Sequence, residues 1–164
     1  MNLLVLSTLT LWFQLTPPYG TYYSGSSVKD SPVKTITFNQ KSLDAIVYHY
    51  RCSKESDLFP GIPVDHEHSL VNRGYDYDDV VAWIKDIKVD KDGSIWGKLI
   101  FSEGWEKAYR LKDFPRYISP VLDTNVEVVG GKPTHVPCRL ISVAFTRKPR
   151  LPLNPNPTTN TSRS

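Results

Sequence analysis

Residues 79–101 decide the fold, and they read DVVAWIKDIKVDKDGSIWGKLIF. Two runs that alternate apolar and polar residues flank the tripeptide Lys91-Asp92-Gly93. An Asp-Gly pair between such runs is a strong local signal for a hairpin, because a tight turn favours residues that accept a positive φ. The stretch therefore predicts two antiparallel strands joined at residues 91–93.

The segments before this hairpin predict two strands and a helix. Residues 1–15 lack the basic residue that precedes the apolar core of a signal peptide and are too short to span a membrane, so they favour an N-terminal strand over a cleaved signal. Residues 16–32 are rich in Pro, Gly and Ser and predict a loop or hairpin. Residues 33–38 (VKTITF) alternate as a half-buried strand does, and Asn39 can cap a helix over residues 40–52. The apolar face of that helix would contain Leu43, Ile46, Val47 and Tyr50.

The segments after the hairpin complete a single domain. Ser102 can cap a short helix over residues 103–114, with Trp105, Ala108 and Tyr109 on a common face. Strands are predicted at residues 115–123 and 135–146, with a turn at the Gly-Gly pair of residues 130 and 131. Many short strands with few helices favour an α+β fold, either a mostly antiparallel twisted sheet or a small β-barrel, with two or three flanking helices. We expect one domain at residues 1–151 and a disordered tail rich in Pro, Asn, Ser and Thr at residues 152–164.

Composition and motifs exclude several classes of function. The net charge is only +3, and the basic residues are scattered among acidic ones, so neither nucleic acid nor a membrane is expected as a partner. The sequence contains no glycine-rich phosphate loop, no GxSxG elbow and no HExxH helix. Nucleotide hydrolases, α/β-hydrolases and zincins are therefore disfavoured.

Titratable groups concentrate in residues 62–68, IPVDHEH. The two-residue period of a strand would place Val64, His66 and His68 on one side and two carboxylates on the other. Such density of titratable groups is typical of functional sites. A zinc site is an alternative, in which His66 and His68 bind the metal and either His135 or Cys138 completes a tetrahedral shell.

A candidate nucleophile lies in residues 115–121, PRYISPV. Ser119 interrupts a β-prone run, and the proline that follows it removes one backbone donor from the sheet. A serine becomes nucleophilic only when a base and donors for the oxyanion are assembled around it. An edge-strand serine with no chemical role is the alternative interpretation.

These segments, in their order along the chain, resemble the Mu-like prophage I protein family. The family pattern runs D-[YF]-E-H, G-W-I, D-G-L-W, Y-L-S-P-V and L-[ST]-x-A-L-T-x-x-P, and the resemblance covers about residues 60–151. It implies a phage prohead protease, similar to tailed-phage prohead proteases and herpesvirus assemblins, which use a histidine and a serine on an antiparallel barrel. By position in the pattern, His68 would be the general base and Ser119 the nucleophile, while His66 stands where an aromatic residue is usual.

The third catalytic residue is where the chain departs from the related proteases. They have an acid on the final strand, and the corresponding place here holds Ser142. Asp65, Glu67 or His135 could orient the imidazole instead, and His135 is our candidate because assemblins use a second histidine. Arg116, close to the nucleophile in sequence, could assist an oxyanion site.

The resemblance implies a serine endopeptidase without a cofactor that cleaves phage scaffold and major capsid proteins. Its place would be the immature prohead in the host cytoplasm, and self-cleavage and a homo-oligomer are compatible with this role. Two other functions stay open from the sequence. One is a catalytically inactive scaffold or capsid-assembly module with the same fold, and the other is a zinc-dependent hydrolase that uses His66 and His68.

Overall fold

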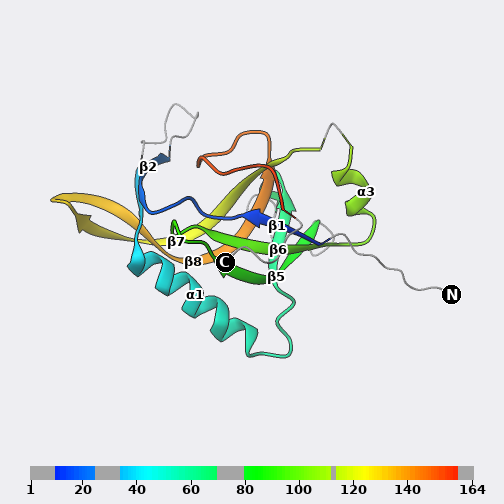
Figure 1. The fold of residues 1–164 in the computed structure, drawn as a ribbon, viewed down its shortest axis with the longest axis horizontal. Coiled ribbons are helices and arrows are strands. Elements are labelled where there is room, and N and C mark those ends of the chain that lie inside the picture. Colours follow the sequence, from blue (N-terminus) through cyan, green and yellow to red (C-terminus); the bar gives the residue numbers. More distant parts are fainter. Residues whose placement is uncertain (1–9, 25–33, 70–79, 112–113, 159–164) are drawn as a thin grey trace.

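The computed structural model describes residues 10–24, 34–69, 80–111 and 114–158, and it confirms the predicted hairpin (Figure 1). Strand β5 (Ala82–Val89) pairs antiparallel with β6 (Ile95–Phe101). Gly93 adopts a φ of 89°, and the Asp92 carboxylate accepts a hydrogen bond of 2.9 Å from the backbone N–H of Ser94. The Asp-Gly pair thus makes the turn by a positive φ and a side-chain acceptor.

The hairpin belongs to one mixed sheet. The remaining strands are β1 (Thr10–Gln14), β2 (Gly20–Ser24), β3 (Lys34–Phe38), β4 (Ile62–His66), β7 (Tyr117–Val129) and β8 (Lys132–Thr146). Their order is β1-β6-β5-β4-β8-β3-β2, and β7 pairs with β8 outside this path. Most neighbours are antiparallel, as predicted, but β3 and β4 run parallel to β8.

The sheet is open, so the β-barrel alternative was wrong. Within the described ranges, β1 and β2 lie at the two ends of the strand path and do not pair with each other. Closing a barrel requires every strand to have two paired edges. The coarser expectation, a largely β protein with flanking helices, is confirmed.

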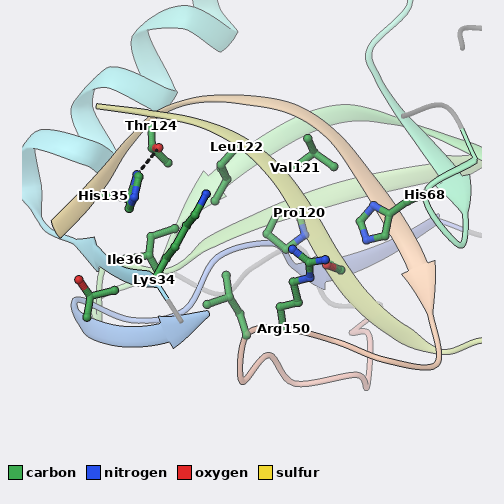
Figure 2. A pocket seen from close by; sticks show the side chains of 12 residues that line it. Lys34, Ile36, His68, Pro120, Val121, Leu122, Thr124, His135 and Arg150 are labelled. Atoms are coloured by element: carbon green, nitrogen blue, oxygen red, sulfur yellow. Dashed lines mark hydrogen bonds between the residues drawn. The ribbon is translucent and has the colours of Figure 1, made fainter. Parts of the chain in front are cut away.

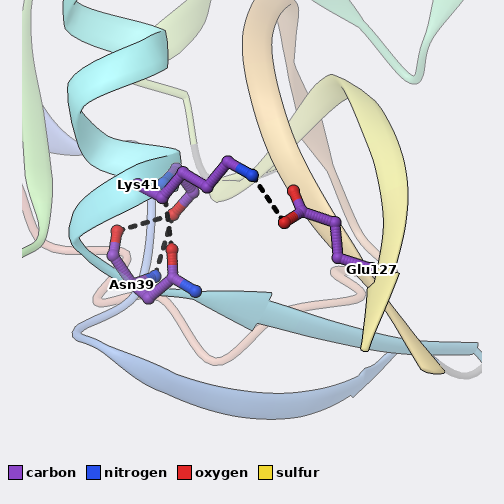
Figure 3. A network of polar contacts seen from close by, with 4 residues as sticks. Asn39, Lys41 and Glu127 are labelled. Atoms are coloured by element: carbon purple, nitrogen blue, oxygen red, sulfur yellow. Dashed lines mark hydrogen bonds and ion pairs between the residues drawn. The ribbon is translucent and has the colours of Figure 1, made fainter. Parts of the chain in front are cut away.

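Helix α1 (Gln40–Lys54) begins where the sequence predicted. The Asn39 side chain accepts a hydrogen bond from the backbone N–H of Ser42, and the Ser42 hydroxyl oxygen accepts one from the backbone N–H of Asn39 (Figure 3). This reciprocal pair satisfies two donors that would otherwise be unpaired at a helix start. Leu43, Ile46 and Tyr50 are buried on the predicted face.

Helix α3 (Trp105–Tyr109) is shorter than predicted. Gly104, with a φ of 86°, occupies the N-cap position, and the expected Ser102 cap is wrong. A residue with a left-handed backbone conformation cannot be part of a right-handed helix, so the helix cannot extend toward Ser102. Tyr109 is nevertheless buried, and Trp105 and Ala108 pack against the core as expected.

Aromatic rings from both ends of the chain form the centre of the core. Phe145 on β8 lies 5.5 Å from Phe13 and 5.3 Å from Phe114, measured between ring centroids, and both contacts are edge-to-face. Tyr109 contacts the same phenylalanines at 5.5 to 5.9 Å. Each such pair adds about 0.5–1.5 kcal/mol beyond the burial of its surface. The cluster therefore ties β1, α3 and β8 together.

The long β7–β8 hairpin extends away from the body of the protein (Figure 1). Gly130 and Gly131 form its turn, as predicted, with φ values of 61° and 81°. Register shifts after Val121 and after Asp123 bend the hairpin. Val126 and Val128 on its outer part are exposed.

The two ends of the described chain lie side by side. Trp12 and Thr158 form an antiparallel bridge with backbone hydrogen bonds of 2.8 and 2.9 Å, and the Asn154 N–H donates to Gln14 Oε1. Part of the predicted tail, up to Thr158, therefore lies along β1, whereas residues 1–9 and 159–164 lie outside the described residues. No helix in the described ranges is both long and apolar enough to cross a membrane.

Gly61 immediately precedes β4 and offers a test of this architecture. Its φ is 112°, and a Cβ at this position would lie 2.5 Å from the Ile84 carbonyl oxygen. We expect Gly61→Ala to lower the free energy of unfolding by about 3 kcal/mol, because the backbone is strained and the β4–β5 approach is blocked. Gly130→Ala is the matched control, since its added methyl group meets open space, and should cost about 1 kcal/mol. Urea denaturation measures both, and equal losses would contradict the β4–β5 packing.

Candidate functional site

One row of residues crosses three strands and contains the predicted nucleophile. Ala144 on β8 is in register with Asp65 on β4 and with Ser119 on β7. Residues in register point to the same face of a sheet, so the Asp65 and Ser119 side chains flank the methyl group of Ala144. Their Cα atoms are two strand spacings apart, about 10 Å. Both side chains are almost fully buried, with exposures of 0% and 2%.

The turn after β4 brings His68 to this face. Strand β4 ends at His66, and Glu67 and His68 have left-handed φ values of 54° and 58°. Non-glycine residues rarely adopt this conformation, and it ends the extended strand, so the alternation of side chains between two faces stops at His66. The expectation that His66 and His68 share one strand face was therefore wrong.

Glu67 fastens this turn to the end of β8. Its backbone N–H donates to the Phe145 carbonyl at 2.8 Å. Its carboxylate accepts hydrogen bonds from the Arg147 N–H at 2.9 Å and from the Thr146 hydroxyl at 3.2 Å. Glu67 is thus engaged with β8, and it positions the backbone that carries His68.

His66 lies among aromatic side chains. Its ring is 6.4 Å from that of Trp105 in a stacked arrangement and 5.7 Å from that of Phe114. In the part of the chain that the structure describes, no group of three or more His, Cys, Asp or Glu residues could hold a metal ion. The zinc arrangement inferred from a shared His66 and His68 face does not form there.

His68 and Ser119 both line one cavity of about 410 Å³. This volume falls within the range of ligand sites, roughly 300–1,000 Å³. Figure 2 shows His68 at one end and His135 with Thr124 at the other, with Pro120 and Arg150 between them. The lining residues are Lys34, Thr35, Ile36, His68, Ser119, Pro120, Val121, Leu122, Thr124, His135, Arg150 and Leu151.

The surroundings keep the His68 imidazole neutral. Burial lowers its pKa below the ordinary value of 6.5, because the charged form loses hydration. The Asp65 carboxylate opposes this effect and raises the pKa, the Arg150 guanidinium lowers it, and Glu67 raises it. At neutral pH the imidazole is therefore unprotonated, which is the state a general base requires.

The other predicted site residues are not placed beside His68 by any contact among the described residues. His135 lines the cavity, but its Nδ1 is 3.0 Å from the Thr124 hydroxyl at the end far from His68 (Figure 2). Arg116 donates to the Leu111 carbonyl at 2.9 Å, and its guanidinium lies 4.9 Å from the centre of the Tyr109 ring. Ser142 is buried, and its hydroxyl has no hydrogen-bond partner among the described residues.

Two residues of the site were not singled out from the sequence. Asp65 was one of three residues, with Glu67 and His135, that could orient His68, and His135 was preferred to it; Arg150 was not considered. The strand register that aligns Asp65 with Ser119 joins β4 to the β7–β8 hairpin, which is far away in the sequence, so no local pattern could reveal it. Arg150 follows β8 and returns over the cavity, and nothing in its flanking sequence indicated this path.

The fold and the site define a class of protein, namely an open mixed β-sheet protein in which a buried serine and a half-buried histidine from distant segments line one cavity. The chain belongs to the Mu-like prophage I protein family, whose N-terminal-domain model matches residues 14–155. It is therefore a phage-associated protein. No curated protein and no solved structure matches it.

The electrostatic balance at His68 can be tested with two opposite substitutions. Asp65→Asn should lower the pKa of His68 further, because it removes a negative charge that favours the imidazolium. Arg150→Gln should raise that pKa, because it removes a repelling positive charge. NMR titration of the His68 ring protons measures both shifts, with the exposed His49 as an internal reference. Shifts of the same sign in both variants would contradict the arrangement of charges.

Proposed function

We propose that this chain is a serine endopeptidase in which Ser119 is the nucleophile and His68 the general base. The observation that carries the proposal is that a single cavity is lined by both residues, which come from β7 and from the turn after β4. A positive-φ turn held by Glu67 carries His68, which lines the same cavity as Ser119. Strained backbone that tertiary contacts hold in place is typical of functional sites.

The proposed reaction follows the acyl-enzyme route. His68 takes the proton from the Ser119 hydroxyl as its oxygen attacks the scissile carbonyl carbon. The peptide C–N bond then breaks, and the imidazolium gives the proton to the leaving amine. Water, deprotonated by the same histidine, attacks the acyl-enzyme ester and releases the new carboxylate together with Ser119.

Asp65 replaces His135 as our proposed third residue. Its carboxylate acts on His68 and favours the imidazolium, which forms during each proton transfer. Complete burial of Asp65 places this interaction in a medium of low dielectric constant, where charges interact more strongly. His135, by contrast, contacts Thr124 at the far end of the cavity.

Membership of the prophage family supports a role in capsid maturation. The proposed substrates are the phage scaffold and major capsid proteins, cleaved inside the immature prohead in the host cytoplasm. Confinement in that shell raises the local concentration of both partners, so even a slow enzyme would meet its substrates often. Self-cleavage is part of the same proposal.

Two substitutions test the proposed dyad. Ser119→Ala and His68→Gln should each reduce kcat for cleavage of the cognate scaffold protein on the order of 10⁴-fold or more, because the dyad acts as a unit. A fluorophosphonate probe should label Ser119 in the wild-type chain, as detected by mass spectrometry, and should not label Ser119→Ala. Ser56→Ala and His49→Gln are the controls, since Ser56 and His49 are exposed and lie outside the cavity lining, and both variants should cleave the scaffold. Undiminished cleavage by Ser119→Ala would refute the assignment.

A second pair of variants tests the third residue. Asp65→Asn should lower kcat on the order of 10²- to 10⁴-fold with little change in KM, since it weakens the imidazolium without touching the substrate. His135→Gln should reduce kcat by less than about tenfold, because its ring is far from His68. Steady-state kinetics on the scaffold protein separate the two parameters. The reverse ranking would restore His135 as the third residue.

A catalytically inactive assembly module is the second candidate. Exposed Val126 and Val128 on the projecting hairpin favour a contact with another protein, and Ser142 stands where related proteases have an acid. If the wild-type chain binds scaffold protein but neither cleaves it nor reacts with the fluorophosphonate probe, this second function replaces the first.

A further inference from the structure

In the cavity beside Ser119, the two lining residues that are charged at neutral pH, Lys34 and Arg150, are both positive. Four of its lining residues have basic side chains, namely Lys34, His68, His135 and Arg150, and no acidic residue belongs to the lining. Lys34 and Arg150 are exposed, and neither forms an ion pair with any described residue. The rest of the wall is neutral and includes apolar side chains such as Ile36, Leu122 and Leu151. The cavity therefore offers cations to whatever it binds.

We propose that this cavity selects substrates with an acidic side chain next to the scissile bond, and that Arg150 is the main specificity-determining residue. The inference rests on the proposed protease function, and it names the substrate class: peptides with Glu or Asp beside the cleaved bond. Arg150 lines the same cavity as Ser119 and Pro120, and Figure 2 shows it in the part of the cavity between His68 and His135. A carboxylate bound there would lie close to the nucleophile.

The chemistry of the arginine side chain suits this role. A guanidinium donates two parallel hydrogen bonds to a carboxylate, and such charge-assisted pairs are among the strongest in proteins. The apolar part of the wall lowers the local dielectric constant below that of open solvent, which strengthens the attraction. Lys34, which also lines the cavity, offers a second positive charge to another acidic side chain of the peptide.

Binding an acidic side chain would also assist the reaction. Arg150 disfavours the His68 imidazolium in the empty site, because the two positive charges repel each other. A substrate carboxylate on Arg150 would screen that repulsion at the moment when His68 accepts the serine proton. Acidic substrates should therefore have a higher kcat as well as a lower KM.

The first experiment compares matched peptides on the full chain. Peptides that span a mapped scaffold cleavage site are made with Glu, Gln or Lys at each position adjoining the bond. Wild-type protein should cleave the best Glu peptide with a kcat/KM at least tenfold above that of its Gln counterpart. Arg150→Gln should reduce this ratio to within about twofold of unity, and Arg150→Glu should favour the Lys peptide. Lys107→Gln is the control, because Lys107 is exposed on α3 and outside the cavity lining, and it should keep the wild-type ratio.

The second experiment separates binding from chemistry. Ser119→Ala protein is titrated into an alanine-serine octapeptide with two central glutamates and a neutral fluorescent dye, and fluorescence anisotropy is followed. The acidic peptide should bind at least tenfold more tightly than its glutamine counterpart, and the difference should disappear when Arg150→Gln is added to the same protein. If the wild-type chain cleaves no peptide but the acidic peptide still binds selectively, the protease function is refuted and the cavity is confirmed as a site for acidic ligands. Cleavage or binding without preference for Glu over Gln would overturn the specificity and leave the protease proposal intact.

Discussion

Strand β8 hydrogen-bonds to β4 along one edge and to β7 along the other, and both registers meet at Ala144. This double pairing sets Asp65 and Ser119 on one face with only a methyl group between them. A slip of one residue in either pairing would turn one of these side chains to the opposite face, because side chains alternate along a strand. Buried valines on the opposite face, Val64 and Val143, oppose such a slip, since it would move them out of their packed positions.

The turn after β4 is the second element on which the site depends. Its two left-handed residues are unfavourable in isolation, by about 1–3 kcal/mol each. Hydrogen bonds from β8 to the Glu67 carboxylate, together with the bond from the Glu67 N–H to β8, offset that strain. The same contacts orient His68 toward the cavity. Stability and placement of the histidine thus come from one set of interactions.

The charges around His68 act in opposite directions and leave a neutral base. Burial and Arg150 disfavour the imidazolium, whereas Asp65 and Glu67 favour it. A base must be unprotonated before the reaction and must tolerate a proton during it. Asp65 meets the second requirement because its negative charge favours the imidazolium, and an anion bound near Arg150 would weaken the repulsion between Arg150 and the imidazolium. The basic lining and the histidine are therefore electrostatically coupled, because an anionic ligand bound at Arg150 would make it easier for His68 to accept a proton.

The sequence by itself determined the local elements: the Asp-Gly hairpin, the Asn39 cap with its apolar helix face, and the Gly-Gly turn. Their signals lie within a few residues of the structures they specify. The motif order also indicated the family before the comparison showed it. Tertiary structure alone decided that the sheet stays open, that α3 is short, and that His68 leaves the face of His66. It also placed Asp65 and Arg150 near His68 while His135 lies at the far end of the cavity, because strand register and turn conformation depend on contacts between residues far apart in the chain.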